Sequence, residues 1–426
     1  MQRYCWIILL ILLASCGGER VSDVGPIATV PDLSDIAVYQ SAGPYAGVLP
    51  GCATATDTTG YCPLEVLPLI GQQVAAPAVS DVMERVLVSH PWMAIRFEAA
   101  LNQLPSDLLT LFKGVTAIVI DNDIRPSFYL SGTAAIYLDP AYLWLTNEEK
   151  ATISQDADFR VTFGDQLQFN GLWRYVKNND YAYPGYSLSG TETRQLVDIL
   201  YPLARILYHE LAHANDFLTP AMQAVLDLQT TPLEASRSLA SEQVANQLQG
   251  VAPLNSNLWN RLAGVLFHGA TPTAQQRGYS AGFVGTEFDS DFASDPYNYA
   301  SIREDVAMLF EETMMKYHFD IDRDLAFADR PLPADPACDD YLVQWGVRNR
   351  LGDPLVKTRA VFIAGELLPS TDLGTFLDGF PEPTALLTGI GWCGNLNPGG
   401  ITPLGRQQAR PIHPGQLAED LRSPEY

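Results

Sequence analysis

The sequence predicts an α+β fold that is rich in helices, with a small mixed sheet and a C-terminal extension. Three observations support this prediction: apolar residues recur at helical spacing over several stretches, two short β-like runs stand between them, and prolines punctuate the chain after residue 330. The chain has 426 residues, of which 47% are hydrophobic and 18% charged. This composition argues against disorder and allows a large core.

The first half of the chain is expected to alternate between helices and strands. In order, the pattern predicts helices at 78–87 and 92–104 and strands at 116–120 and 134–138. The first helix follows from apolar residues at intervals of three and four, which continue through Val86 and Leu87. The second helix is expected to end at Pro105. The two strands are short apolar runs, each closed by a turn signal that contains aspartate.

The rest of the chain is expected to be mainly helical after a long loop. In order, the sequence predicts a loop at 150–190 that contains a strand at 159–163, helices at 193–217 and 234–248, a glycine-rich loop at 268–300, and helices at 301–318 and 356–368. The loops are inferred from their polar, glycine and tyrosine content, and the helices from apolar periodicity. Pro202 is expected to kink or to start its helix.

The charge of the chain excludes two classes of partner. Lysine and arginine total 26 against 49 acidic residues, which gives a formal net charge of −23 at pH 7. Nucleic-acid binding relies on basic side chains that neutralise phosphates. A polybasic hold on anionic lipid needs the same side chains. We therefore expect no nucleic-acid partner and no membrane contact through a basic patch.

The N-terminal residues predict export. Arg3 precedes an unbroken apolar run at 6–13. As a helix this run is only about 12 Å long, which is too short to span a bilayer. It is typical of a secretory signal peptide, which we expect at residues 1–15.

The residues that follow resemble a lipid-attachment motif. The segment LASCG at 13–17 resembles the bacterial lipobox, which implies a diacyl group on Cys16. Gly17 in place of aspartate implies sorting to the outer membrane. A plain secretory signal with a coincidental cysteine is the alternative. No other segment is apolar enough to span a bilayer, so the lipid is the expected sole anchor, and residues 16–50 are expected to form a flexible tether.

Four cysteines remain beyond the signal peptide and the lipidation site: Cys52, Cys62, Cys338 and Cys393. In an oxidising compartment they allow three pairings. The favoured set is Cys52–Cys62, which closes a short loop, and Cys338–Cys393, which ties the C-terminal region to itself. A zinc cluster of cysteines is the rival interpretation, but no C-x-x-C spacing occurs.

The segment HELAH at 209–213 carries the strongest chemical signal. His209 and His213 are four residues apart and lie on one face of a helix, so both can reach a single ion. Neutral imidazole is a favoured zinc ligand. Glu210 is placed to accept a proton from a zinc-bound water. Two histidines that share a solvated helix face by coincidence are the plain alternative.

A catalytic zinc ion needs a third protein ligand. The third histidine of metzincins is absent, because Thr219 stands six positions after His213. Glu304 is the best candidate, because it lies in the first turn of the helix expected at 301–318, a rigid element from which a carboxylate can project. The alternative is an acid that the helix dipole favours at this position.

Two motifs together resemble a known class of peptidase. HELAHAND at 209–216 and E-x-x-A-x-x-F at 304–310 are similar to the gluzincins, and among them to the lethal-factor-like zinc peptidases. The resemblance implies Zn²⁺ as the cofactor, with Glu304 as its third ligand. It also implies an oxyanion-stabilising tyrosine seven residues before that glutamate, which is Tyr297; Tyr299 is a close competitor.

The resemblance also implies a zincin-like fold, although it covers only the two helices and the loop before the second. Residues 51–330 are expected to form a zincin-like metallopeptidase domain and residues 331–426 a C-terminal extension. The two short strands are expected in its active-site sheet, whose edge strand in zincins pairs with extended substrate. Glu304 lies 91 positions after His213, which is longer than usual and implies an insertion around 220–290.

Four other side chains have roles to weigh near such a site. Glu234, 21 residues after His213, is one alternative third ligand. Asp289, in a segment faintly similar to the aspartate-ligand motif of aspzincins, is another. Asp216 is expected to orient a histidine, and His318 to cap the C-terminal end of its helix.

The predicted function is that of a lipid-anchored zinc metallopeptidase acting on a peptide or protein substrate. Glu210 is its expected general base, and Tyr297 is expected to stabilise the oxyanion. One alternative is a non-catalytic zinc-binding lipoprotein of the cell envelope, which Glu210 argues against because a structural site needs no base. Another is a metal-dependent hydrolase that acts on cell-wall material.

Overall fold

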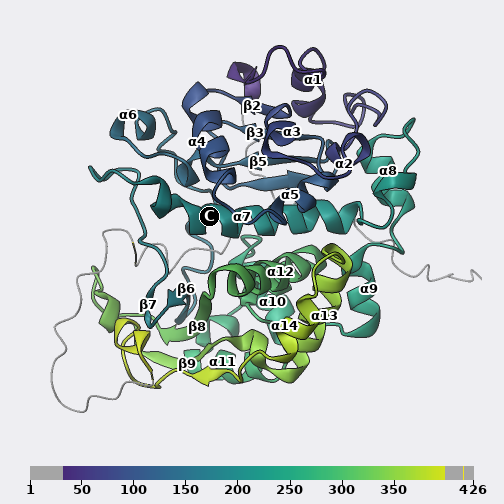
Figure 1. Ribbon diagram of the computed structural model, residues 1–426. Helices are drawn as coiled ribbons and strands as arrows, with labels where there is room; N and C mark the ends of the chain where they lie inside the picture. Colours follow the sequence, from purple (N-terminus) through teal and green to yellow (C-terminus); the bar gives the residue numbers. More distant parts are fainter. Residues whose placement is uncertain (1–31, 399–415, 417–426) are drawn as a thin grey trace, which may run out of the picture.

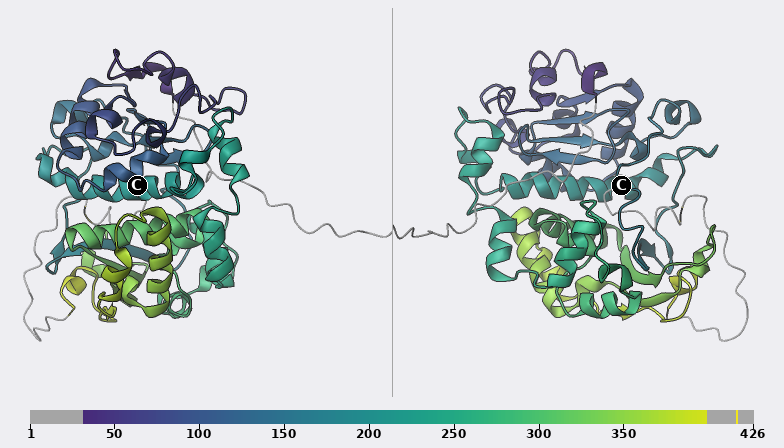
Figure 2. Two further views of the ribbon diagram at one scale, coloured as in Figure 1. Left: turned by 45° about the vertical axis from the view of Figure 1, so that its right-hand side comes forward. Right: turned by 180° about the vertical axis from the view of Figure 1, so that it is seen from behind.

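Two five-stranded sheets lie on opposite sides of one long helix, α7 (Leu196–Phe217), as Figures 1 and 2 show. The structure is a computed structural model that describes residues 32–398 and Gln416. The expected signal peptide (1–15), the lipidation site Cys16 and the start of the expected tether lie outside the described residues. The predicted α+β class is confirmed, although two small sheets are present where one was expected.

The upper sheet in Figure 1 has three parallel strands between two antiparallel edge strands. Its strand order is β1 (Ala37–Val38), β2 (Val86–Val88), β3 (Ala117–Ile120), β5 (Ala135–Leu138) and β4 (Phe128–Leu130). The inner strands are apolar throughout because both faces are covered. Ile118 and Ile120 join the core around α7, whereas Ala117 and Val119 face a second cluster beside the N-terminal segment. β1 lies within the expected tether, so the ordered fold begins before residue 51.

Short helices accompany this sheet. They are α1 (Leu49–Ala53), α2 (Ile70–Gln73), α3 (Val79–Met83), α4 (Pro91–Leu101), α5 (Leu108–Leu111) and α6 (Asn147–Lys150). The helix at 92–104 and the strands at 116–120 and 134–138 are confirmed as α4, β3 and β5. The helix at 78–87 is corrected: α3 ends at Met83, and Val86 and Leu87 belong to β2. A strand buried on both faces has no polar face, so apolar spacing does not distinguish it from a helix.

The lower sheet is antiparallel and joins distant parts of the chain. Its order is β10 (Thr384–Ala385), β9 (Val343–Arg348), β8 (Asp322–Asp329), β6 (Phe169–Lys177) and β7 (Asp180–Tyr181). β6 lies where a loop was expected, and residues 159–163 form a turn in which Arg160 pairs with Asp158 instead of a strand. β8 and β9 pair across residue 330, so the C-terminal part continues the same sheet.

The helices after α7 are α8 (Pro232–Ser238), α9 (Val244–Val251), α10 (Asn257–Leu266), α11 (Ala281–Asp289), α12 (Ile302–Phe319), α13 (Pro354–Leu367) and α14 (Leu373–Asp378), with 3₁₀ turns η6 (Pro296–Tyr299), η7 (Cys338–Asp340) and η9 (Cys393–Leu396). Of these, α11 and α12 contact the lower sheet, and α9, α12 and α13 contact α7. The helices at 301–318 and 356–368 are confirmed as α12 and α13. The helix at 234–248 is two helices, because Gln243 folds back to bond the Ser236 carbonyl. α11 lies inside the expected loop at 268–300.

The main core brings α7 and α12 together. One apolar cluster contains residues of both helices, of α4, α5 and α9, and of the C-terminal helices α13 and α14. The chain beyond residue 330 is therefore built into the same core as α7. None of the helices within residues 32–398 has the length and apolar character needed to cross a bilayer.

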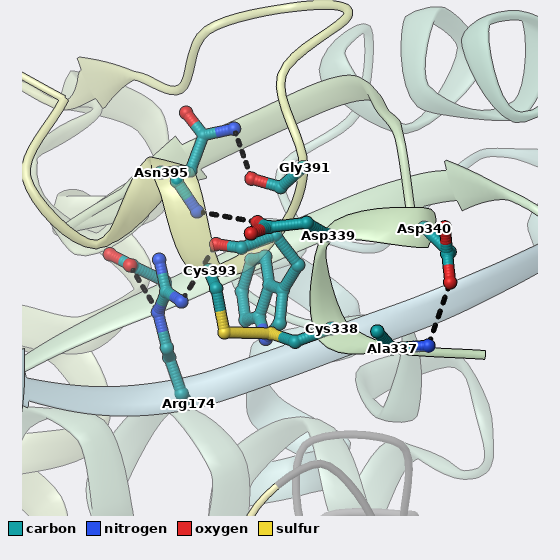
Figure 3. Close-up of a disulfide and its surroundings, with 11 residues drawn as sticks. Arg174, Ala337, Cys338, Asp339, Asp340, Gly391, Cys393 and Asn395 are labelled. Carbon is teal, nitrogen blue, oxygen red and sulfur yellow. Dashed lines mark hydrogen bonds and ion pairs between the residues drawn. A yellow bond between two sulfur atoms is a disulfide. The ribbon is translucent and has the colours of Figure 1, made fainter. Parts of the chain in front are cut away.

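Two disulfides have the pairing that the sequence favours. Cys52 bonds Cys62, and Cys338 bonds Cys393. The second joins η7 to η9, and Figure 3 shows it beside the Arg174 side chain. The guanidinium of Arg174 donates to the Trp392 carbonyl, the residue before Cys393, at 3.0 Å. The C-terminal segment is thus linked to β6 by the Arg174 hydrogen bond, and its two ends are linked to each other by the disulfide.

Candidate metal centre

The HELAH segment lies within the second half of α7. The helix begins after Gln195, whose N–H donates to the Asp198 carboxylate at 2.7 Å. It runs through Pro202 rather than starting there, and its second half is buried because the upper sheet and α12 cover it. The rings of His209 and His213 are 4.9 Å apart, and both side chains are buried.

Glu304 enters the site from the first turn of α12. Ser301 caps this helix, its hydroxyl accepting the N–H groups of Arg303 and Glu304. Oε2 of Glu304 lies 3.1 Å from Nε2 of His209 and 3.2 Å from Nε2 of His213. The three possible ligand atoms lie within 4.8 Å of one another, so this largely buried group could bind one metal ion.

The pKa values of Glu304 and His213 depend on one another and on His209 because the three side chains lie close together. Burial alone would raise the pKa of Glu304, but the two imidazoles hold that pKa well below its usual value. Burial would lower the pKa of His213, but Glu304 raises it. A divalent ion held by the three groups would likewise offset the charge of the buried carboxylate. Two imidazole nitrogens and one carboxylate oxygen form a donor set that suits zinc.

The two predicted catalytic side chains belong to the same region. Glu210 follows His209 on α7 and is 2% exposed. Tyr297 lies in η6, and its ring centroid is 6.4 Å from that of His209. Asp295 caps η6 by accepting the Tyr297 N–H at 2.8 Å, and Arg323 holds Asp295 at 2.6 Å. A buried ion pair therefore fixes the turn that carries Tyr297.

Tyr299, the competing tyrosine, serves a different role. Its hydroxyl donates to Asp291 at 2.8 Å, and its ring stacks on Trp259 in a separate apolar cluster. Tyr297 instead packs against Phe267, with ring centroids 4.8 Å apart. Of the two candidates, Tyr297 is the one beside His209.

Glu311 also takes part in the site and was not predicted from the sequence. Its Oε2 lies 3.2 Å from Nδ1 of His209, the nitrogen that faces away from Glu304. The Tyr175 hydroxyl donates to Glu311 at 2.6 Å, and Arg205 lies 3.7 Å from it. Burial would raise the pKa of Glu311, but Arg205 and His209 lower it below the usual value. The available signal was its place seven residues after Glu304, two turns along the same helix face.

The two alternative third ligands lie outside the metal group. Glu234 caps α8, where its carboxylate accepts the Thr231 N–H at 2.9 Å. Asp289 is an exposed residue that pairs with Arg350 at 2.9 Å. Each of these acids has a structural partner, and of the three candidate third ligands Glu304 is the one that lies near both histidines.

The expectation for Asp216 is corrected. Asp216 does not orient a histidine: its carboxylate accepts from Arg303 of α12 at 2.7 Å and from the Ala245 N–H of α9 at 2.8 Å. It thereby holds the start of α12 against the end of α7. His318 does lie in the last turn of α12, where its Nε2 is 2.7 Å from Asp107.

A cavity of 780 Å³ lies beside η6, although none of the residues His209, Glu210, His213, Tyr297 and Glu304 lines it. Its wall includes Pro202 of α7, Pro296 of η6, and Phe267, which packs on Tyr297. Other lining residues include the aromatic and basic side chains Trp144, Trp173, Tyr183, Tyr186, Arg160 and Arg194 and the acids Asp139, Asp156, Asp158, Asp165 and Asp295. Gln416 reaches the same wall, where its side-chain oxygen accepts the Gly185 N–H at 2.6 Å. This volume is in the range of protein ligand sites.

Comparisons with known proteins identify no relative. No family model, no curated protein and no solved structure matches the chain. The chemistry of the site must therefore be argued from its own residues.

Proposed function

We propose that the protein is a zinc-dependent metallopeptidase with a zincin-like fold. The convergence of His209, His213 and Glu304 carries the proposal. Three such ligands leave the fourth position of a tetrahedral zinc ion for water, as in catalytic rather than structural sites. The additional buried acid next to His209, Glu210, supports catalysis because a structural site needs no base.

The chain's own residues supply the proton transfers. When bound, zinc supplies Lewis-acid chemistry that polarises a carbonyl and lowers the pKa of water toward neutrality. Glu210 accepts the proton of the attacking water and returns it to the leaving amine. The Tyr297 hydroxyl donates to the oxygen of the tetrahedral intermediate. A C–O bond forms and the C–N bond breaks, so the products are a carboxylate and an amine.

Two features support an extended peptide as the substrate. The cavity beside η6 has the volume and the aromatic wall to hold side chains. β4 is an edge strand of the upper sheet and packs on α7, where Tyr129 stacks on Phe217. An edge strand can pair with the backbone of an extended chain.

The proposed third ligand can be tested by metal analysis. The purified wild-type protein should contain one zinc ion per chain, and Glu304→Ala should bind zinc far more weakly because only two ligands remain. Asp289→Ala is the matched control, since it removes the rejected candidate, and should keep its zinc. Equal zinc affinity in all three proteins would mean that Glu304 is not a ligand.

The proposed general base can be tested by separating zinc content from turnover. Glu210→Gln should retain zinc and lose about 10²- to 10⁴-fold in the hydrolysis of denatured casein. His213→Ala should lose both zinc and activity. A zinc-loaded Glu210→Gln protein that cleaves casein at the wild-type rate would rule out this mechanism. If the zinc-loaded wild type cleaves no protein, the result would favour a structural lipoprotein. If it also cleaves peptidoglycan, the result would favour a cell-wall hydrolase.

We also propose that the protein is a lipoprotein of the outer membrane, anchored through Cys16. The support is the lipobox-like segment LASCG at 13–17 and the glycine that follows the cysteine. Metabolic labelling with an alkyne fatty acid should mark the wild type but not Cys16→Ser. Equal labelling of both proteins would contradict the assignment.

A further inference from the structure

The turn that follows β3 contains two carboxylates that the metal centre does not use. Asp121 is completely buried, and its Oδ1 accepts the Asp123 N–H at 3.1 Å. Its Oδ2 is also buried and makes no well-aligned hydrogen bond within residues 32–398 and Gln416, although the Asp123 carboxylate and the Ser89 hydroxyl lie close to the carboxyl group. One oxygen of Asp123 accepts the Asp32 N–H at 3.0 Å, and the other is buried without a partner within the same residues.

This pair lacks the basic partner that several other buried acids of the chain have. Asp324 is paired with Arg174 and Arg348, for example. No such basic partner joins Asp121 in the described part of the chain. Burial and the neighbouring Asp123 carboxylate raise the pKa of Asp121 to about 7. A buried carboxylate without a partner is costly, so a compensating positive charge is expected at this position.

We propose that Asp121 and Asp123 bind a calcium ion at the end of β3. A cation between them satisfies both orphaned oxygens and offsets the charge that burial penalises. The donors are oxygens without histidine or cysteine, which favours calcium over zinc. Ser89, which follows the neighbouring strand β2 and whose hydroxyl accepts the Asn122 N–H at 3.1 Å, offers a third oxygen.

The ion would fasten three segments of the upper half together. Asp123 holds Asp32, where the described chain begins. Ser89 follows β2, and the Asn122 carbonyl accepts the Ser154 N–H at 2.9 Å. Calcium binding is therefore expected to stabilise the body of the fold next to the N-terminal segment. This site is independent of the proposed peptidase activity.

Calorimetry and thermal unfolding of the full chain test the proposal, with stoichiometric zinc present so that the first site is filled. After EGTA treatment and zinc restoration, the wild type should bind one calcium ion per chain, and its midpoint temperature should rise with calcium. Asp121→Asn should bind calcium at least tenfold more weakly. Asp165→Asn, an exposed aspartate outside this turn, is the control and should behave as wild type.

Two results would overturn the proposal. One is the absence of calcium binding by the wild type at millimolar concentration. The other is equal calcium affinity in wild type and Asp121→Asn, which would place the ion elsewhere. If Asp121→Asn does not fold, Asp123→Asn replaces it, since Asp123 is only partly buried. A third result is that calcium does not change the stability of the wild type and that Asp121→Asn is more stable than the wild type at pH 8. This result would show that the carboxyl groups share a proton instead.

Discussion

His209 is fixed at both of its ring nitrogens. Its Nε2 faces Glu304 at 3.1 Å, and its Nδ1 faces Glu311 at 3.2 Å. A neutral imidazole that donates its Nδ1–H to Glu311 keeps the Nε2 lone pair for a metal ion. Tyr175 and Arg205 hold Glu311 in turn, so the ring cannot rotate without breaking buried interactions. The carboxylate therefore orients the metal ligand.

We expect Glu311→Gln to weaken zinc binding by about 10- to 100-fold. The amide can still accept the Nδ1–H, but it carries no charge to raise the basicity of the ring. Competition with a chromophoric chelator measures the affinity. Glu312→Gln is the matched control, because Glu312 is its buried neighbour and bonds Ser294 rather than a histidine. Equal zinc affinities in the two variants would mean that Glu311 does not tune the ligand.

The spacing of the two histidines in the sequence predicted one part of this site, whereas the positions of its other residues depend on how distant helices pack together. His209 and His213 are neighbours on any helix, so four residues of separation predict their meeting. Glu304 meets them only because α12 packs along α7; its place in the first turn of an expected helix made it the candidate, and a family resemblance pointed to the same residue. Asp216 was misassigned because its partners, Arg303 and the Ala245 N–H, come from α12 and α9. Contacts between distant elements leave little trace in local sequence.

Among the elements, α12 carries a third buried acid whose charge state depends on its surroundings. Glu312 accepts a hydrogen bond from the Ser294 hydroxyl at 2.8 Å, and Arg323 lies 3.7 Å away. Burial raises the pKa of Glu312 to about 8; Arg323 opposes this shift, and Asp295 adds to it. At neutral pH the folded protein therefore keeps this carboxyl group mostly protonated.

This shift predicts how stability depends on pH. The pKa of Glu312 in the folded state, about 8, lies above its ordinary value of 4.5, so the folded chain holds a proton that the unfolded chain releases. The free energy of unfolding should fall as pH rises from about 5 to 8, with at most about 1.4 kcal/mol per pH unit from this group. Urea unfolding of Glu312→Gln should lack this contribution. An unchanged pH profile would place the buried proton on another group.

Long elements with one dominant pattern could be predicted, and short or fully buried strands could not. α7, α12 and α13 each span at least three turns, so their apolar spacing is repeated. The sequence pattern wrongly predicts that the residues of β2 belong to a helix, because both faces of this strand are apolar. The sequence predicts a loop where β6 lies, because this segment carries polar residues such as Arg174. That side chain is buried through its ion pair with Asp324, 150 positions later. No local pattern reveals such a partner.

The complete fold depends on ties between the C-terminal segment and the lower sheet. Arg174 of β6 donates to Asp324 of β8 at 2.8 Å, and its guanidinium lies 3.8 Å from the ring centre of Trp392. Arg348 of β9 bonds the same aspartate at 2.6 Å. The Cys338–Cys393 disulfide closes the chain around this network (Figure 3). The covalent and the ionic links thus act on the same part of the molecule.

The two disulfides are predicted to differ in their effect on stability because they close loops of different length. Cys338 and Cys393 are 55 positions apart, whereas Cys52 and Cys62 are 10 apart. If unfolded-chain entropy dominates, replacing the first pair by serine should lower the free energy of unfolding by about 4 kcal/mol and replacing the second by about 3 kcal/mol. Urea unfolding of the two double variants measures both.

Zinc affinity provides the control for these variants. Neither disulfide contributes an atom to the group formed by His209, His213 and Glu304, so both double variants should bind zinc as the wild type does. A larger stability loss for the Cys52–Cys62 pair would show that native packing outweighs loop entropy. Weaker zinc binding without the Cys338–Cys393 link would instead mean that the C-terminal segment supports the metal centre through the core that it shares with α7.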